Sequence, residues 1–166
     1  DGAQVLGTDL NAEAGQALCD EVGASFLRQD VSDRARWAEI VAVAVQKLGR
    51  LDILVNNAGM VSGASIGDGS DEEMFAAWDQ VIAVNLTGTM LLCREVLPHL
   101  VASRGSIVNA ASTAALAGLP CGVAYSASKG GVLAMTRSIA VEYAKRGVRA
   151  NCVCPGDIKT GMTHKV

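Results

Sequence analysis

The chain has 166 residues, half of them hydrophobic, with 18 glycines and a formal net charge of −3. This length can bury one sizeable hydrophobic core, so we expect a single domain, complete or partial, over residues 1–166. The mild acidity and the lack of a basic run exclude a typical nucleic-acid-binding protein. No apolar stretch reaches the ~18 residues that a membrane span needs, so we expect no membrane partner.

The five cysteines lie at positions 19, 93, 121, 152 and 154 and include no C-x-x-C pair. Cys152 and Cys154 flank Val153 in a predicted strand, so they share a face. We interpret the cysteines as small apolar residues in a reducing compartment, and with no secretory signal this predicts a cytoplasmic protein. His99 and His164 are the only histidines and have no ligand pattern around them, so no metal site is expected.

Apolar and amphipathic runs alternate along the chain and predict repeated strand–helix units. The strands are expected at residues 3–8, 25–29, 51–55, 105–110 and 148–153. The helices are expected at residues 11–22, 32–48, 71–103 and 125–145, with Ser32 as an N-cap and Pro98 as a kink or a turn. Such units imply an α/β fold, a doubly wound parallel sheet with helices on both faces in three α/β/α layers.

Polar or glycine-rich residues follow each predicted strand. They are Asp9, Asp30, the Asn-Asn-Ala-Gly run at 56–59, Ser112 and the pair Pro155-Gly156. In doubly wound sheets, ligands bind beyond the carboxyl ends of the strands, so these turns outline one crevice. Within the run at 56–59, small side chains stand where a flat ligand would approach the backbone.

Asp9 can accept hydrogen bonds from both hydroxyls of an adenosine ribose and would repel a 2′-phosphate, which favours NAD over NADP. Alternatively, Asp9 caps the helix that begins near Asn11, and one residue could do both. Asp30 has the same alternative for the next helix. Asn85 is an asparagine inside a helical run, which is mildly unfavourable. Either it has a specific task, such as holding a water, or it faces solvent.

Tyr125 and Lys129 are four residues apart, and Ser112 lies thirteen residues before Tyr125. A four-residue step puts two side chains on one face of a helix. A free tyrosine has a pKa of about 10, and a neighbouring ammonium lowers such a pKa. A serine hydroxyl could hold a substrate oxygen against the phenol, which gives an acid/base site for an alcohol or a carbonyl. The alternative is a tyrosine and a lysine on a surface helix.

Taken together, these segments resemble the short-chain dehydrogenase/reductase family. They occur in family order, at nearly family spacing, over almost the whole chain. The matching segments are residues 2–5 with Asp9, Asp30-Val31, residues 52–59, residues 84–86, residues 105–109 with Ser112, residues 125–129 and residues 151–160.

The resemblance implies a Rossmann-like fold and a role for each matching residue. Tyr125 would be the general acid/base, Lys129 would lower its pKa and bind the nicotinamide ribose, Ser112 would orient the substrate oxygen, and Asn85 would hold a water. The implied NAD-binding residues are Asp9, Asp30, Val31, Asn57, Ala58, Gly59, Tyr125, Lys129, Pro155, Gly156, Ile158 and Thr160. A homo-oligomer, dimer or tetramer, through helices 79–103 and 125–145 is also implied.

The chain departs from the family in three segments. The glycine-rich pyrophosphate loop T-G-x-x-x-G-x-G, the first strand–helix unit and the C-terminal strand have no counterpart in the sequence. In the strand order 3-2-1-4-5-6, that first strand is central. Its absence would leave two half-sheets with unpaired backbone and apolar surface. We therefore expect a fragment of a longer protein, inactive by itself, or alternatively a truncated relative that has lost cofactor binding.

The predicted function is an NAD-dependent oxidoreductase that interconverts a secondary alcohol and a ketone. The alternative is a non-catalytic binding or scaffold protein on the same fold, while a flavodoxin-like response regulator would not explain Y-x-x-x-K with Ser112. The substrate would be a small, hydrophobic alcohol or ketone. Candidate substrate contacts are Val61, Ala114, Leu119, Cys121, Gly122 and Asp157.

Overall fold

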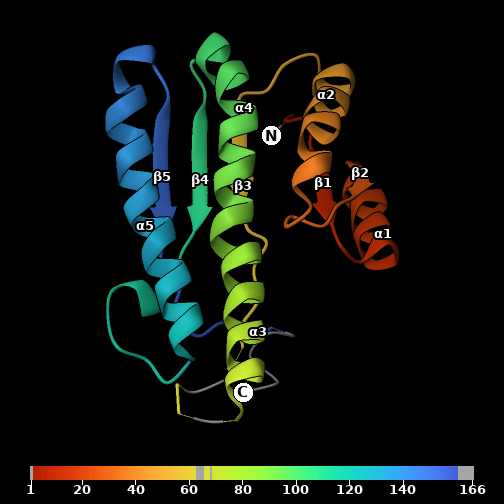
Figure 1. Cartoon of the computed structure of the whole chain (residues 1–166). Helices are drawn as coiled ribbons and strands as arrows, with labels where there is room; N and C mark the ends of the chain where they lie inside the picture. Colours follow the sequence, from red (N-terminus) through yellow and green to blue (C-terminus); the bar gives the residue numbers. More distant parts are fainter. Residues whose placement is uncertain (1, 63–65, 68, 161–166) are drawn as a thin grey trace.

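Strands and helices alternate in the computed structural model, which describes residues 2–62, 66–67 and 69–160 (Figure 1). The strands of this part are β1 (Leu6–Asp9), β2 (Ser25–Arg28), β3 (Ile53–Asn56), β4 (Ser106–Ala110) and β5 (Arg149–Val153). The α-helices are α1 (Ala12–Val22), α2 (Trp37–Leu48), α3 (Asp71–Ile82), α4 (Thr89–Ser103) and α5 (Val123–Tyr143). The predicted α/β class is confirmed, because every strand pair is parallel.

Short helical turns adjust the predicted boundaries. They are η1 (Arg34–Arg36), η2 (Ala83–Gly88), η3 (Thr113–Ala115) and η4 (Ala144–Arg146). The predicted N-cap at Ser32 is wrong, because the Ser32 hydroxyl donates to Asp30 Oδ1 at 2.6 Å and Asp33 caps η1 instead. Pro98 lies inside α4 and forms no turn there.

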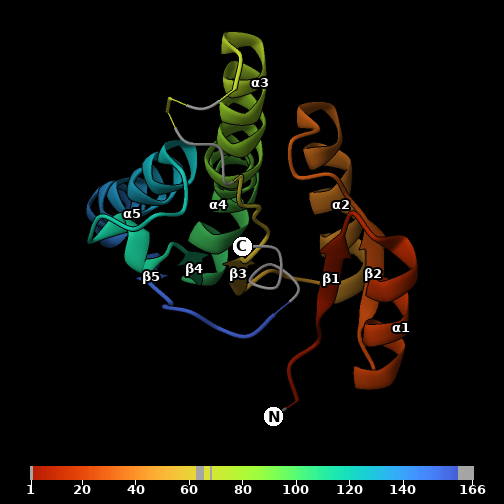
Figure 2. The same ribbon diagram turned by 90° about the horizontal axis from the view of Figure 1, so that it is seen from below.

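The strands form two sheets, β1–β2 and β3–β4–β5. Leu6 pairs with Ser25 in the first, and Ile53 with Ser106 and Ser106 with Arg149 in the second. Figure 2 shows α2, α4 and α5 on one face and α1 on the opposite face of β1–β2. No described strand lies between β1 and β3, so the expected division into two half-sheets is confirmed.

One long helical run crosses the molecule. It consists of α3, the π-helical turn η2 and α4, and by length and composition alone it could also span a membrane. A single helix of this kind is weak evidence, because a core helix passes the same test. Here Val81, Leu91, Val96 and Leu100 are buried, whereas 39% of the most apolar 18-residue segment of the run is buried in all.

A hydrophobic core lies between the larger sheet and its helices. Its buried members are Val41, Leu54, Cys93, Val96, Leu97, Leu100, Ile107, Ile139 and Val148. A second cluster of Trp37, Ile40 and Leu91 packs against Leu27 and Val31 of the smaller half. Helix α2 therefore contributes to both clusters and holds the two half-sheets side by side.

The two halves also meet at a glycine. A Cβ on Gly88 would lie 2.7 Å from the carbonyl oxygen of Val31, so only a residue without a side chain allows this approach. The Trp37 indole nitrogen donates to the same carbonyl at 3.2 Å. Val31, at the end of the smaller sheet, is thereby fixed against η2.

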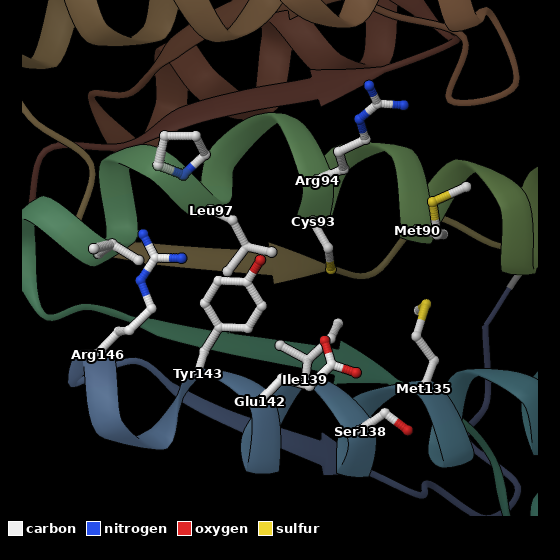
Figure 3. Close-up of a pocket in the computed structure, with 12 residues that line it drawn as sticks. Met90, Cys93, Arg94, Leu97, Met135, Ser138, Ile139, Glu142, Tyr143 and Arg146 are labelled. Carbon is white, nitrogen blue, oxygen red and sulfur yellow. The ribbon is translucent and has the colours of Figure 1, made fainter.

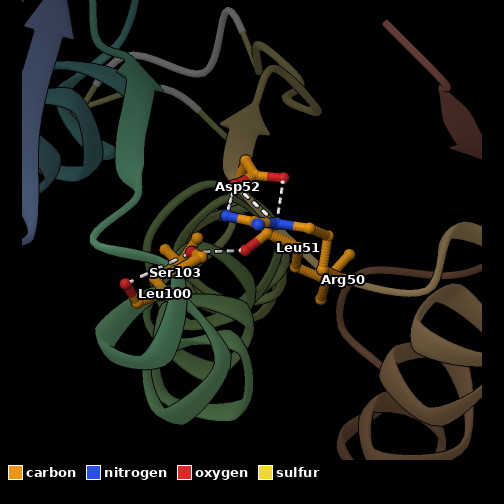
Figure 4. Close-up of polar contacts among 5 residues, drawn as sticks. All are labelled: Arg50, Leu51, Asp52, Leu100 and Ser103. Atoms are coloured by element: carbon orange, nitrogen blue, oxygen red, sulfur yellow. Dashed lines mark hydrogen bonds and ion pairs between the residues drawn. The ribbon is translucent and has the colours of Figure 1, made fainter.

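Polar contacts fasten the amino end of β3 to the end of α4 (Figure 4). Arg50 binds both carboxylate oxygens of Asp52, with its shortest contact at 2.6 Å. The Ser103 hydroxyl donates to the carbonyl of Leu51 at 2.7 Å. This end of the sheet is structural, and the polar residues predicted for function lie at the opposite end.

Candidate active site

Tyr125 and Lys129 lie on the first two turns of α5, beyond the carboxyl ends of β4 and β5. The Lys129 ammonium nitrogen is 5.7 Å from the centroid of the Tyr125 ring, so both side chains share one face of the helix. Tyr125 is partly exposed, whereas Lys129 is only 5% exposed. The arrangement places a cation beside a phenol that solvent and ligands can reach.

The end of β4 holds the Lys129 ammonium. Its nitrogen donates to the carbonyl of Ala110, the last residue of β4, at 2.8 Å. Burial lowers the pKa of Lys129, while the nearby Cys152 acts in the opposite direction. Lys129 is thus a desolvated cation at a fixed position, which is a frequent feature of functional sites.

Asn85 is buried inside the π-helical turn η2, so the solvent-facing alternative is wrong. Its carbonyl oxygen Oδ1 accepts from Met60 N at 2.8 Å, and its Nδ2 donates to Met60 O at 2.9 Å and to Ser128 Oγ at 3.0 Å. The Ser128 hydroxyl in turn donates to the carbonyl of Tyr125 at 2.7 Å. A π-bulge often marks a functional position in a helix, and this one connects the β3 loop to the backbone of Tyr125.

Gly59 brings the loop after β3 against both groups. A Cβ at this position would lie 3.2 Å from Lys129 Nζ and 3.4 Å from Asn85 Oδ1, tighter than ordinary contact. Asn57 and Ala58 precede it on the exposed surface. Of the three residues, Gly59 therefore lies directly against the lysine.

Ser112 follows β4 by two residues and is nearly buried. Its Oγ accepts from Ala114 N at 3.2 Å and caps η3, so the hydroxyl hydrogen is still available to a ligand. The next residue, Thr113, donates its backbone N–H to the carbonyl of Pro155 at 2.9 Å. This bond joins the Ser112 turn to Pro155-Gly156 after β5, from which the exposed residues Ile158 and Thr160 follow.

Asp9 and Asp30 lie together at the end of the smaller sheet, where Gln29 N donates to Asp9 O at 2.9 Å. Neither of them caps a helix. Asn11 caps α1, while Asp9 Oδ1 accepts from Asn11 N at 2.8 Å. Asp30 accepts from the Ser32 hydroxyl and the Ser32 N–H, and these bonds lower the pKa of Asp30. The capping alternatives for both aspartates are therefore wrong.

Gln29 was not predicted to be a site residue, yet its polar side chain is buried at this edge of the sheet. It is 1% exposed, its Nε2 donates to Asp30 O, and its Oε1 has no hydrogen-bond partner among the described residues. A buried acceptor without a partner is unfavourable unless something donates to it.

A network of buried hydrogen bonds connects β3, β4 and α5 near the site. Asn56 Nδ2 donates to Asn109 Oδ1 at 2.8 Å, and Asn109 Nδ2 donates to Thr136 Oγ1 at 2.9 Å. Asn56 also contacts Cys93 Sγ, and burial raises the pKa of the Cys93 thiol to about 11. The sequence could have indicated this hydrogen-bond network, because Asn56 and Asn109 stand within otherwise apolar strands.

Four of the predicted substrate contacts lie in the chain segment that precedes α5, and Val61 and Asp157 lie on the loops after β3 and β5. Ala114 is buried, while Leu119, Cys121 and Gly122 lie on the loop that leads to Tyr125. The Cys121 thiol is within 3.5 Å of the Ser126 hydroxyl. All five cysteines are free; Cys19 and Cys93 are buried and the others are partly exposed. No group of three or more potential ligands for a metal occurs among the residues that the structure describes.

Comparison with known proteins gives consistent results. The short chain dehydrogenase family profile matches residues 1–166. Relatives include 2-(R)-hydroxypropyl-CoM dehydrogenase of Xanthobacter autotrophicus, 42% identical over 98% of this chain and 68% of the relative. Another is 3-oxoacyl-[acyl-carrier-protein] reductase of Thermotoga maritima, 40% identical over 100% of this chain and 68% of the relative. The curated relatives include others of which the chain spans 63% to 65%.

The fold is similar to a crystal structure described as a short-chain dehydrogenase/reductase from Burkholderia xenovorans. The TM-score is 0.87 at 36% identity, and the match covers 99% of this chain and 64% of that one. This chain therefore matches about two thirds of the length of these proteins.

The burial of Lys129 predicts an effect on stability. Because its folded pKa lies below the ordinary 10.5, wild-type stability should rise as the pH increases from that folded pKa towards 10.5. Lys129→Met removes the buried charge and should raise the free energy of unfolding at pH 7 by about 0.5–2 kcal/mol. This gain should shrink near pH 10.5, measured by urea unfolding at both pH values.

The exposed Lys47 on α2 supplies the control, and Lys47→Met should change stability little at either pH. A large loss of stability in Lys129→Met would contradict the argument. It would mean that the hydrogen bond to Ala110 outweighs desolvation of the ammonium.

Proposed function

Because this chain belongs to the short-chain dehydrogenase family, we propose that it is the greater part of an NAD-dependent oxidoreductase that interconverts a secondary alcohol and a ketone. The observation that carries the proposal is the placement of Lys129. Its ammonium is buried, bonded to Ala110 O, covered by Gly59 and beside the accessible Tyr125 ring. A buried ammonium held beside an accessible phenol forms the kind of site in which a side chain exchanges a proton with an alcohol or a carbonyl.

Each residue has a distinct task in the proposed reaction. In oxidation, Tyr125 takes the hydroxyl proton while the C–O bond becomes a carbonyl; in reduction it returns that proton. Ser112 donates its free hydroxyl hydrogen to the same oxygen. Lys129 holds a positive charge beside the Tyr125 ring, and Asn85 and Ser128 fix the backbone that carries Tyr125. The nicotinamide, when bound, accepts or supplies the hydride of the carbinol carbon.

The described residues fit part of such a cofactor. The Asp9 carboxylate and the close approach at Gly59 lie at the ends of β1 and β3. Asp30, Val31, Asn57 and Ala58 would line the same path, and Pro155, Gly156, Ile158 and Thr160 its far end. No glycine-rich phosphate loop occurs in the sequence, so the pyrophosphate has no holder in these residues.

Tyr125→Phe tests the proposed acid/base role. The measurement is kcat for alcohol oxidation in the full-length protein with NAD. General acid/base groups contribute roughly 10²–10⁴-fold, so kcat should fall by about that factor. Tyr143→Phe is the matched control, since Tyr143 lies at the far end of the same helix beside Arg146. Equal turnover of wild type and Tyr125→Phe would instead favour a binding or scaffold function.

Asp9 is proposed to select NAD over NADP. Its carboxylate is fixed at the end of β1 by Asn11 N–H, where it would meet the adenosine ribose and repel a 2′-phosphate. Asp9→Asn keeps the acceptor and removes the charge. We expect the ratio of kcat/KM for NAD over NADP to drop about tenfold, roughly 1.4 kcal/mol. Asp20→Asn on α1 should leave the ratio unchanged, and an unchanged ratio in both variants would remove Asp9 from this role.

We also propose that the protein is a homo-oligomer that buries the outer face of α4 and α5. Figure 3 shows the groove between these helices, with Met90 and Met135 at one end and Tyr143 and Arg146 at the other. Its cavity volume is about 460 Å³. An open apolar groove between two long helices suits the helices of a second copy.

Met135→Arg places a charge in this groove and should shift the protein towards monomer in sedimentation velocity runs. Val141→Arg is the control on the same helix, because Val141 is 79% exposed and lies outside the groove. A native mass that is monomeric in the wild type, or unchanged in Met135→Arg, would reject the α4–α5 interface.

A further inference from the structure

Cys152 and Cys154 lie side by side at the carboxyl end of β5. Cys152 belongs to the strand, and Cys154 follows its last residue, Val153. The carbonyls of Val153 and Pro155 accept hydrogen bonds from backbone N–H groups of the segment after β4, at 2.8 and 2.9 Å. The chain therefore stays extended through Cys154, as the residue before a proline prefers. Residues two apart in an extended chain point to the same face, and both cysteines are partly buried while Val153 is 49% exposed.

The face that carries the two thiols points towards α5, which runs alongside β5 (Figure 1). Burial raises the pKa of the Cys152 thiol, Thr136 of α5 acts against this increase, and Cys154 adds to it. Burial lowers the pKa of Lys129, and a negative charge on Cys152 opposes that shift. Among the described residues, no ion pair joins Lys129 to a carboxylate. The thiols thus lie within electrostatic reach of a buried ammonium that has no anionic partner.

The spacing of the pair suits a bridging ion better than a disulfide. Two residues of a strand span about 6.6 Å, and their Cβ atoms on one face are roughly as far apart. A disulfide needs Cβ atoms about 3.8 Å apart, so its formation would require the backbone to move. The hydrogen bonds on either side of Cys154 oppose such a movement. Metal–thiolate bonds are roughly 2.3 Å long, so one ion joins two sulfurs about 4.6 Å apart without bending the strand.

We propose that Cys152 and Cys154 bind one soft monovalent metal ion of the Cu(I) class between their sulfurs, beside the Lys129 ammonium. Each thiol gives its proton to solvent, and the ion keeps its oxidation state. A monovalent ion with two thiolates carries one net negative charge, which the ammonium balances, as a buried charge requires. Thiolates are soft ligands and select Cu(I).

Zinc does not fit this pair. Structural Zn(II) sites have four protein ligands and catalytic sites have three, and no group of three or more potential ligands occurs in the part of the chain that the structure describes. Cu(I) forms two-coordinate complexes with thiolates, so the pair alone completes its site. This site is independent of the proposed reaction, because the binding involves neither Tyr125 nor a nicotinamide.

The affinity is measured by the transfer of Cu(I) from its coloured bicinchoninate complex to the full-length protein, in anaerobic buffer. Cys152→Ser and Cys154→Ser should each weaken binding by roughly 10²-fold or more, because the second thiolate binds an ion that the first already holds. Cys121→Ser is the matched control, since Cys121 is also partly exposed, and it should not change the affinity.

Lys129→Met tests the balancing charge. Loss of an ammonium that lies just outside the ligands should lower the Cu(I) affinity by roughly 10–100-fold. Lys47→Met removes an exposed ammonium of α2 and should leave the affinity unchanged.

Thiol labelling of the wild type tests the same site without a substitution. Trypsin cleaves after Arg149 and Lys159, so the peptide of residues 150–159 carries both cysteines and no other. One equivalent of Cu(I) should protect both of them from iodoacetamide, whereas Cys121 should still be labelled and Zn(II) should protect neither. Any of three results would overturn this site: Cu(I) protects only one of the two thiols, Zn(II) protects both equally well, or Lys129→Met or either serine variant binds Cu(I) like the wild type.

Discussion

The hydrogen bond from Lys129 to the carbonyl of Ala110 is the interaction on which the site depends. A buried ammonium needs a fixed acceptor, and the last residue of a central strand provides one that cannot move without disturbing the sheet. Because parallel strands end together, the loops after β3, β4 and β5 all reach this point. Gly59 closes over the lysine, Ser112 follows two residues after its acceptor, and Thr113 ties that turn to Pro155.

The two half-sheets are held in place from one face, by side chains and not by strand pairing. Trp37 packs in the cluster that joins α2 to α4, and its indole nitrogen binds Val31 O. Gly88 allows that carbonyl to approach the helix that carries Asn85. The edge with Asp9 and Gln29 and the edge with Lys129 are thereby set in one arrangement, although no described strand connects them.

The sequence was sufficient to predict features that depend on the spacing of residues within one helix or strand. The four-residue step from Tyr125 to Lys129, the strand order and the turns at strand ends follow from periodicity and topology, and the resulting fold class is confirmed. It was insufficient to predict which of several nearby groups a polar side chain bonds to. Ser32 bonds Asp30 and not the helix, and Asn11, not Asp9, caps α1. The contacts of Ser128 and the isolation of Gln29 Oε1 depend on distant segments, which no local pattern reveals.

Burial makes the Cys93 thiol less reactive than the partly exposed thiols of the chain. With a pKa raised to about 11, this cysteine is almost entirely protonated in neutral solution, so alkylating reagents and mild oxidants have little thiolate to attack. Cys121 is partly exposed on the loop that leads to Tyr125. A maleimide dye should therefore spare Cys93 and react with the partly exposed thiols of Cys121, Cys152 and Cys154.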